Sequence, residues 1–365
     1  MLFTYLVLPL SCYNCAVLVE KIIDRIRSFG VRKLSYAGRL MLVKSVLTSL
    51  YTYWANIFLI PKGVLRKIDS ICRNYLWDGS SQYVRVPMVG WEQVCSPINE
   101  GGLGIKFSQT WNVAMVGKLV WWVYSKPDSL WVKWVHHVYL KGAEWHSYSP
   151  KAYMGGNWKD ICKTKDIISA GFRDGRWIAN EKGYSVSSAY DWLRLKMQRV
   201  GWAKIVWSTW CLPKHSFLVW LMLKNALPIK ERLFRHGIGD DDSCCVCQMA
   251  VESIEHLFQR CHLVQRLMGL VADQLQVQHP VGNAIIWLGR KRWTKGKNDT
   301  CLFAFMAVYY TVWNQRNICW LEGKVMRPEV LKAGIMRLVQ LRIVQTWSTF
   351  TQVDKAWINL IGLYA

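Results

Sequence analysis

Apolar residues follow the spacing of an α-helix most clearly in two stretches between residues 38 and 79. The apolar positions of the first stretch are Leu40, Val43, Leu47, Leu50 and Trp54. Spacings of three and four residues place such side chains on one face of a helix. Pro61 begins the second pattern and Asp78-Gly79 ends it. Its apolar positions are Leu65, Ile68, Cys72 and Tyr75. The pattern therefore predicts two consecutive amphipathic helices.

The remaining sequence predicts more helices joined by irregular segments. The first nineteen residues carry no charge, but they lack the basic segment with which a signal peptide begins, and Pro9, Ser11 and Asn14 interrupt their apolar run. We interpret them as a buried strand and a turn, and not as a signal peptide or a membrane span. Residues 80–110 predict irregular structure, with a turn at the glycine-rich GGLG of 101–104. Further stretches with helical apolar spacing are 111–145, 188–197, 216–223 and 302–313. The predicted fold class is mainly α.

The stretch between residues 111 and 145 is rich in tryptophan. Trp131, either Trp134 or Val135, and Val138 recur at helical spacing. This predicts core packing and not a platform for stacking nucleic-acid bases.

Charge narrows the range of partners. The 365 residues contain 47 Lys and Arg against 24 Asp and Glu, which gives a formal charge of +23. Such an excess favours a polyanion, RNA or DNA before an acidic membrane surface. The hydrophobic content of 52% is ample for about two domains. A single basic residue on a helix is nevertheless more often solvated than bound to phosphate.

One cysteine-rich segment has the spacing of a metal site. Cys244, Cys247, His256 and Cys261 form a Cys-x2-Cys-x8-His-x4-Cys run. Thiolate sulfur and imidazole nitrogen are the ligands of a tetrahedral structural zinc, and four of them leave no position for a reactive water. We therefore predict one structural Zn²⁺ ion. The twelve cysteines have no regular framework, which indicates a reducing compartment.

Alternatives to this ligand set remain open from the sequence. A redox pair would need a βαβ context, which the sequence around Cys244 does not have. Cys245 is an alternative to Cys244, and His262 is an alternative to Cys261. His256 and Cys261 are five residues apart, about 140° around a helix. Cys261 must therefore lie at or beyond the end of the helix that carries His256.

Longer motifs resemble one known family. The segment from Trp202 to Cys261, with Leu212-Pro213-Lys214 and Glu255-His256-Leu257-Phe258, is similar to the zinc-binding domain of plant LINE-type (non-LTR) retrotransposon reverse transcriptases. KLSYAGRLMLVKSVL at 33–47 and YWANIFLIPKGV at 53–64 resemble the segment that joins the polymerase palm to that domain, including its thumb-like helices. WNQRN at 313–317 resembles the Trp-x-x-Arg-Asn signature of the tail that follows.

The resemblance implies four segments. They are a palm-end strand with thumb-like helices at 1–79, a tryptophan-rich connecting region at 80–155, the zinc-binding domain at 180–265 and a helical tail at 266–365. A thumb would bring basic side chains to a primer–template, and the basic loop GRKRWTKGK at 289–297 adds to them. The candidate nucleic-acid-binding residues are Arg32, Lys33, Arg39, Lys44, Arg66, Lys67, Arg73, Lys291 and Arg292.

The same resemblance argues against catalysis by this chain. Members of the family carry their catalytic aspartates in a Tyr/Phe-x-Asp-Asp turn of the palm, upstream of the point where this sequence begins. The acidic run Asp240-Asp241-Asp242 lies in a loop, whereas two-metal chemistry needs rigidly held carboxylates. We expect no catalytic residues, no small-molecule substrate and no membrane association.

The expected function is that of an inactive reverse-transcriptase fragment that binds zinc and, without sequence preference, RNA or DNA. The alternative is a structural or protein-interaction remnant in which zinc only stabilises the fold. A polymerase would require a palm in the same polypeptide. The family copies RNA at chromosomal targets, which implies a nuclear location, or otherwise a cytoplasmic one, and no secretion.

Overall fold

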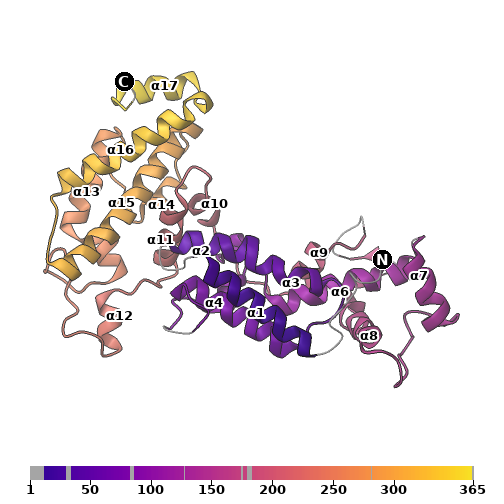
Figure 1. The fold of residues 1–365 in the computed structure, drawn as a ribbon. Helices are drawn as coiled ribbons and strands as arrows, with labels where there is room; N and C mark the ends of the chain where they lie inside the picture. Colours follow the sequence, from indigo (N-terminus) through magenta and orange to yellow (C-terminus); the bar gives the residue numbers. More distant parts are fainter. Residues whose placement is uncertain are drawn as a thin grey trace. The chain divides into compact units, whose positions relative to one another are not determined.

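A computed structural model describes residues 12–29, 34–82, 86–126, 128–173, 176–178, 183–280 and 282–363. The chain divides into two compact units (Figure 1). Unit 1 comprises residues 1–87, 91–97 and 102–198, and unit 2 comprises 88–90, 98–101 and 199–365. Helices dominate both units, and the only sheet among the described residues has two strands. The predicted mainly α fold class is confirmed.

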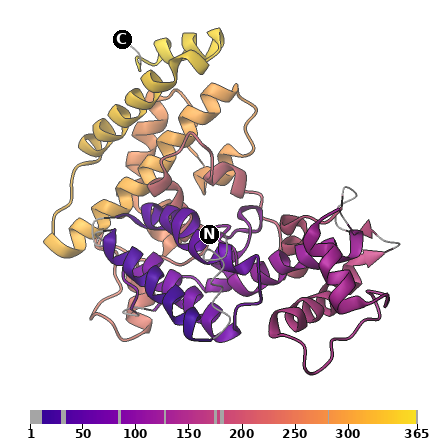
Figure 2. The ribbon, with the colours of Figure 1, turned by 45° about the vertical axis from the view of Figure 1, so that its right-hand side comes forward.

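The first half of unit 1 is a packed group of helices. Its elements are α1 (Cys12–Ser28), α2 (Tyr36–Leu42), the π-helical turn η3 (Val43–Leu47), α3 (Thr48–Ala55) and α4 (Lys62–Asp78). α1 and α4 lie side by side, and Figure 2 shows the same pairing from another direction. Leu18, Val19, Ile22 and Ile26 of α1 are buried at helical spacing. The turn predicted before residue 20 is therefore wrong for residues 12–19, and the predicted strand lies outside the described residues.

The predicted helix after Gly38 is confirmed, but its buried face changes along its length. Leu40, Val43 and Leu47 are buried as the pattern predicts. Beyond them the buried residues are Tyr51 and Ala55, and not Leu50 and Trp54. η3 accounts for the shift, because a π-helical turn holds one more residue than an α-helical turn and moves the following side chains around the axis.

The helix predicted after Pro61 is confirmed as α4. Its four predicted apolar positions are all buried, and it ends at Gly79, whose φ of 71° is left-handed. The C-terminal carbonyls of a helix lack intrahelical partners. Arg39 supplies one, since its guanidinium donates to Trp77 O at 3.1 Å and to Leu76 O at 3.5 Å. Arg39 thereby joins α2 to the end of α4.

The glycine-rich segment is a turn, as predicted. Gly101 and Gly104 have φ angles of +79° and +72°, a region that favours glycine. A Cβ on Gly102 would lie 2.0 Å from the carbonyl oxygen of Ser96. Close backbone approach explains this glycine, and no phosphate-binding loop is needed.

The second half of unit 1 encloses a core rich in aromatic rings. Its elements are α5 (Trp91–Cys95), α6 (Ser108–Ser125), α7 (Leu130–Val135), the π-helical turn η5 (His136–Leu140), α8 (Gly156–Ile168), the 3₁₀ turn η6 (Ser169–Gly171), the antiparallel strands β1 (Phe172–Arg173) and β2 (Arg176–Trp177), and α9 (Val186–Leu193). α6 packs against α8 and α9. Val135 is buried, whereas Trp134 and Val138 are 51% and 37% exposed. Trp131 is partly buried and packs against the core. The prediction of core packing is therefore confirmed for Trp131 and for Val135, the alternative to Trp134, and it is wrong for Val138.

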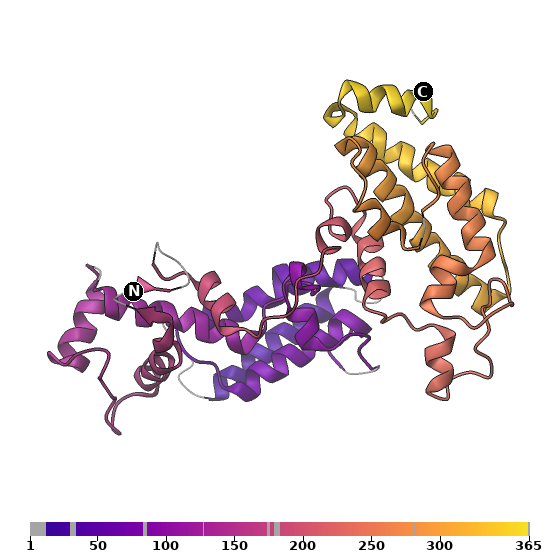
Figure 3. The ribbon, with the colours of Figure 1, turned by 180° about the vertical axis from the view of Figure 1, so that it is seen from behind.

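Unit 2 is built around one long helix. Its elements are the 3₁₀ turn η4 (Ile98–Glu100), α10 (Ala203–Val206), α11 (Pro213–Leu223), α12 (Lys230–Arg235), the π-helical turn η7 (His256–Arg260), α13 (His262–Gln274), α14 (Ala284–Leu288), α15 (Lys295–Glu322), α16 (Pro328–Thr346), the 3₁₀ turn η8 (Trp347–Thr349) and α17 (Gln352–Leu360). α11, α13, α14 and α16 all pack on α15, as Figure 3 shows from behind. Residues 301–309 of α15 are buried without interruption.

The compact units divide the chain differently from the four predicted segments. α9, at the start of the predicted zinc-binding segment, packs on α6 in unit 1. The second unit resumes at Arg199. The boundaries at 79, 155, 180 and 265 stay predictions about the family's segments. Among the described residues, no helix is long and apolar enough to span a membrane.

A buried carboxyl in unit 1 makes its stability depend on pH. Asp69 of α4 is 8% exposed and accepts a hydrogen bond of 2.7 Å from the hydroxyl of Ser108. Burial raises the pKa of Asp69 from 3.8 to about 6. Between these values the folded chain binds more protons than the unfolded chain, so the free energy of unfolding falls as pH rises. The loss is complete above the folded pKa.

We expect Asp69→Asn to remove this loss, because the amide stays neutral and its oxygen still accepts from Ser108. The free energy of unfolding of the variant, relative to wild type, should rise by about 1–3 kcal/mol between about pH 4 and pH 7.5. Denaturant titrations of the full chain at several pH values measure this difference. Asp191→Asn is the control, because a hydrogen bond from Lys196 lowers the pKa of Asp191 and reverses the sign. Parallel pH profiles for wild type and Asp69→Asn would contradict the prediction.

Candidate metal centre

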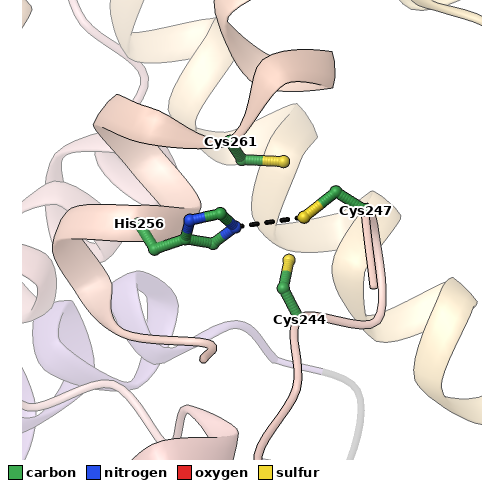
Figure 4. Close-up of side chains that lie close together, drawn as sticks. All are labelled: Cys244, Cys247, His256 and Cys261. Atoms are coloured by element: carbon green, nitrogen blue, oxygen red, sulfur yellow. Dashed lines mark hydrogen bonds between the residues drawn. The ribbon is translucent and has the colours of Figure 1, made fainter. Parts of the chain in front are cut away.

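The first two predicted ligands lie on a tight turn. The Cys244 amide donates to Ala250 O at 2.8 Å, and the Gln248 amide donates to Cys244 O at 2.7 Å. Gln248 has a φ of 56°, and Ser243 and Val251 form an antiparallel bridge that closes the turn. The chain therefore doubles back within eight residues. Both Cys244 and Cys247 point to the same side of this turn (Figure 4).

The other two predicted ligands lie at the ends of η7. His256 is its first residue, and the His256 amide donates to the hydroxyl of Ser253 at 2.9 Å. Cys261 follows Arg260, the last residue of η7, and is the N-cap of α13. The prediction that Cys261 lies at or beyond the end of the helix carrying His256 is confirmed. A five-residue π-helical turn returns the chain to the same side, which an α-helical turn would not do.

These turns bring the four side chains together. One ligand atom of each of Cys244, Cys247, His256 and Cys261 lies within 4.8 Å of all the others. Cys247 Sγ and His256 Nε2 are 3.2 Å apart (Figure 4). Zinc–sulfur bonds of about 2.3 Å in a tetrahedron imply sulfur–sulfur separations of about 3.8 Å. Three sulfurs and one nitrogen at such separations fit a zinc ion.

The pKa shifts differ in direction among three of the clustered side chains. The hydrogen bond from the Cys244 thiol lowers the pKa of Cys261, and the backbone amides at the start of α13 lower it further. The same hydrogen bond, followed by burial, raises the pKa of Cys244. Burial lowers the pKa of His256 and so favours the neutral imidazole, the form that coordinates metals.

Both alternative ligands point elsewhere. The thiol of Cys245 lies 3.5 Å from Glu252 Oε2 and 3.5 Å from Arg316 O. His262 is exposed on the first turn of α13 and is not part of the cluster. The geometry therefore selects Cys244 over Cys245 and Cys261 over His262. Four clustered ligands also favour a metal site over a redox pair.

A buried ion pair that the sequence did not predict lies beside the cluster. Glu252 and Arg316 have exposed side-chain fractions of 0% and 1%, and Arg316 Nη2 lies 2.6 Å from Glu252 Oε1. The same oxygen accepts from Arg316 Nε at 2.9 Å and from the Lys230 amide at 2.9 Å. Arg316 also donates to Pro228 O and to the side chain of Asn317. The pair connects the metal-binding turn to α15.

The Trp-x-x-Arg-Asn motif at 313–317 surrounds this arginine. The guanidinium carbon of Arg316 lies 5.1 Å from the ring centre of Trp313 and 4.2 Å from that of Trp320. The motif therefore combines a stacking ring, a buried cation and a hydrogen-bond acceptor for it. This motif was the available sequence signal for Arg316. Glu252 had none, because nothing in the sequence distinguishes it from the exposed Glu255 three residues later.

The candidate nucleic-acid-binding residues of unit 1 have different surroundings. Arg32 and Lys33 lie outside the described residues. Arg39 binds the end of α4, and Arg73 donates to Ser70 Oγ at 3.0 Å. Burial lowers the pKa of Lys44, and the nearby Lys106 lowers it further. Arg66 and Lys67 are exposed on α4, and neither is paired with a carboxylate among the described residues. They are therefore the best placed for phosphate contacts.

The two candidates of unit 2 lie in the basic loop between α14 and α15. Arg292 is exposed, whereas the Lys291 ammonium lies over the ring of Trp287 at 4.3 Å. The predicted loop is confirmed for residues 289–294, and α15 begins at Lys295. Contacts of these residues with nucleic acid stay a prediction.

Similarity to known proteins supports a zinc site at the cluster. Residues 184–267 match a family model described as zinc-binding in reverse transcriptase. An Arabidopsis thaliana protein named "Putative ribonuclease H protein" is 30% identical over 159 residues, which is 42% of this chain and 25% of that protein. The match thus spans a quarter of the length of this relative. Together the two similarities support an origin in a retroelement.

We expect purified protein to contain about one zinc per chain. Cys247→Ser/His256→Ala should lose nearly all of it, because two of four ligands are removed. Metal analysis by mass spectrometry measures the ratio. His262→Ala is the matched control, since it removes a neighbouring imidazole outside the cluster. Full zinc in the double variant, or its loss in His262→Ala, would show that the ligand set is wrong.

We also expect the chain to lose stability when one partner of the Glu252–Arg316 pair is replaced. Arg316→Met should cost about 3–5 kcal/mol of stability, because it leaves a carboxylate buried without its counter-ion. Glu252→Gln/Arg316→Met should cost less than the two single changes together. Denaturant titrations of the four chains measure this coupling. Arg266→Met is the control, because the Arg266–Glu329 pair is exposed and its loss should change the stability little.

Proposed function

We propose that this chain is a catalytically inactive part of a plant LINE-type reverse transcriptase that binds one structural zinc ion and, without sequence preference, RNA or DNA. One observation carries the proposal. All four clustered ligands, Cys244 to Cys261, lie inside residues 184–267, which match the reverse-transcriptase zinc-binding family. Sequence similarity and side-chain geometry thus point to the same module by independent routes.

The ligand set supports a structural role for the zinc. Four protein ligands complete a tetrahedral shell and leave no place for a water nucleophile. Bound zinc would hold the Cys244–Cys247 turn against the start of α13, two segments with little regular structure between them. Zinc binding of this kind contributes directly to the free energy of folding.

Exposed cations support binding to a polyanion. The formal charge is +23, and Arg66 and Lys67 are adjacent on the exposed side of α4. Phosphate contacts of this kind carry no sequence information, so the expected binding is non-specific. If the chain binds no nucleic acid, the charge is unexploited and a structural or protein-interaction role replaces this proposal.

The acidic residues support the absence of catalysis. Asp241 of the run Asp240-Asp241-Asp242 accepts from the amide of Ser243 at 2.8 Å and pairs with Lys230 at 3.1 Å. Its carboxylate therefore shapes the turn before Cys244. Primer extension on a poly(rA)–oligo(dT) substrate with Mg²⁺ or Mn²⁺ tests whether the chain is inactive, and nucleotide incorporation by purified protein would overturn this part of the proposal.

A nuclear location is part of the proposal, because the family copies RNA at chromosomal targets. Imaging of a tagged chain tests this location.

Salt dependence is the main test of nucleic-acid binding. If roughly five phosphates are neutralised, log affinity for a duplex should fall with log salt concentration with a slope of about −4. Arg66→Ala/Lys67→Ala should flatten this slope by about 2, because each phosphate contact that is lost lowers the number of counterions released on binding by close to one. Titration of a labelled duplex from about 50 to 300 mM salt measures the slopes.

The control changes the net charge equally at lysines that are already paired. Lys133→Ala/Lys163→Ala removes partners of Asp128 and Asp160 and should leave the slope unchanged. Equal flattening in both double variants would place the contacts outside α4. No binding at low salt would reject the nucleic-acid part of the proposal.

A further inference from the structure

Three tryptophans and two lysines alternate on one side of unit 2. The Lys291 ammonium lies 4.3 Å from the ring centre of Trp287 and 5.8 Å from that of Trp293. The Lys297 ammonium lies 5.0 Å from the rings of both Trp293 and Trp357. We call these five residues the Trp–Lys ladder. Its order in space is Trp287, Lys291, Trp293, Lys297 and Trp357.

Four elements hold the ladder in place. Trp287 comes from α14, Lys291 and Trp293 from the following loop, Lys297 from the first turn of α15, and Trp357 from α17. The Trp287 ring meets Trp293 at 5.6 Å and Phe305 at 6.2 Å, both edge to face. Rings fixed by such packing keep their orientation without a ligand. All five ladder side chains are half-buried, so part of each stays accessible.

The charge around the ladder is positive. Arg290, Arg292 and Lys295 are exposed beside it. Asp354, a buried carboxyl next to Lys297, accepts from the hydroxyls of Thr294 and Thr351 and from the Lys297 amide. Among the residues that the structure describes, no carboxylate forms an ion pair with the side chains of Lys291, Arg292 or Lys297. The ladder therefore attracts anions.

A purely structural role for the ladder is the simpler alternative. Lysine stems cover tryptophan rings on many protein surfaces, and an exposed cation–π pair is worth only about 0.5–1 kcal/mol. Stacking of one nucleic-acid base on an aromatic ring is worth about 1–3 kcal/mol, and each phosphate contact adds counterion release. Exchanging the lysine contacts for bases and phosphates is therefore favourable. The larger energy of base stacking, compared with the lysine–tryptophan contacts, favours a binding surface over a purely structural role.

We propose that the Trp–Lys ladder binds single-stranded nucleic acid, with a base stacked on Trp293 and the ammonium groups of Lys291 and Lys297 turned to the flanking phosphates. A duplex hides its base faces, so it would gain only the phosphate contacts. The inference rests on the proposed nucleic-acid function and deepens it, because it names a strand form and a site on unit 2 that is separate from Arg66 and Lys67 of unit 1.

The test uses the full chain, a labelled oligonucleotide of about fifteen nucleotides as oligo(dT) or oligo(U), and a duplex of equal length. Trp293→Ala should weaken single-strand binding by about 5-fold to 150-fold and duplex binding by less than about 2-fold. Trp293→Phe, which keeps a stacking face, should stay within a few-fold of wild type. Lys291→Ala/Lys297→Ala should flatten the single-strand salt slope by about 1.4, at about 0.7 per contact. Comparison of oligo(dT) with oligo(U) separates DNA from RNA.

Trp134→Ala is the matched control, since it removes a tryptophan of unit 1 that is 51% exposed and should change neither affinity. Zinc content and melting temperature of each variant check that it is folded. Unchanged single-strand binding by folded Trp293→Ala, or equal losses for strand and duplex, would overturn the ladder proposal. If that occurs while duplex binding still depends on Arg66 and Lys67, only the ladder fails. If the wild-type chain binds neither the single strand nor the duplex, both proposals are rejected.

Discussion

The buried ion pair between Glu252 and Arg316 sets the geometry of the metal-binding segment. Taking two charges out of water costs several kcal/mol per ion, so such a pair persists only when its polar atoms are satisfied. Here the Glu252 carboxylate accepts from Arg316 and from the Lys230 amide, with the thiol of Cys245 3.5 Å away. Glu252 lies five residues after Cys247 and four before His256. The contacts that satisfy this charge therefore also fix the path of the chain between the two halves of the metal site.

This arrangement gives α15 two functions in the fold. Residues 301–309 are its buried core, on which α11, α13, α14 and α16 pack. Its last turns contact the metal-binding segment, where Arg316 meets Glu252 and the Cys319 thiol donates to Cys245 O at 2.8 Å. The Cys244–Val251 turn contains little regular structure, so its conformation depends on such contacts. A helix with a continuous core is a rigid support for both.

Sequence periodicity predicted the features that depend on local spacing. It found the buried face of α4 because a regular helix repeats every 3.6 residues. The Cys-x2-Cys-x8-His-x4-Cys spacing found the four side chains that the structure brings together, because such spacing is typical of a metal site. Periodicity failed where one residue changed the repeat, as at η3, which moved the buried face from Leu50 to Tyr51. It also missed Glu252, because a partner 64 residues away in sequence leaves no local pattern. The sequence could not choose between Cys244 and Cys245 for the same reason. The choice depends on the contacts of Cys245 with Glu252 and Arg316, and Arg316 is distant in sequence.

Net charge is a poor guide to a binding surface until the contacts of each cation are known. Arg316 is buried in an ion pair, and the half-buried Arg39 donates to the free carbonyls at the end of α4, so both guanidinium groups serve contacts within the fold. Lys165 is likewise buried and donates to three backbone carbonyls, those of Trp145, His146 and Tyr148. A folded basic protein therefore spends part of its positive charge on internal acceptors. Arg66 and Lys67 on α4 and Arg292 in the loop before α15 are exposed, and none of them forms an ion pair with a carboxylate among the described residues. Exposure and uncompensated charge occur together at these positions, so the search for phosphate contacts begins with them.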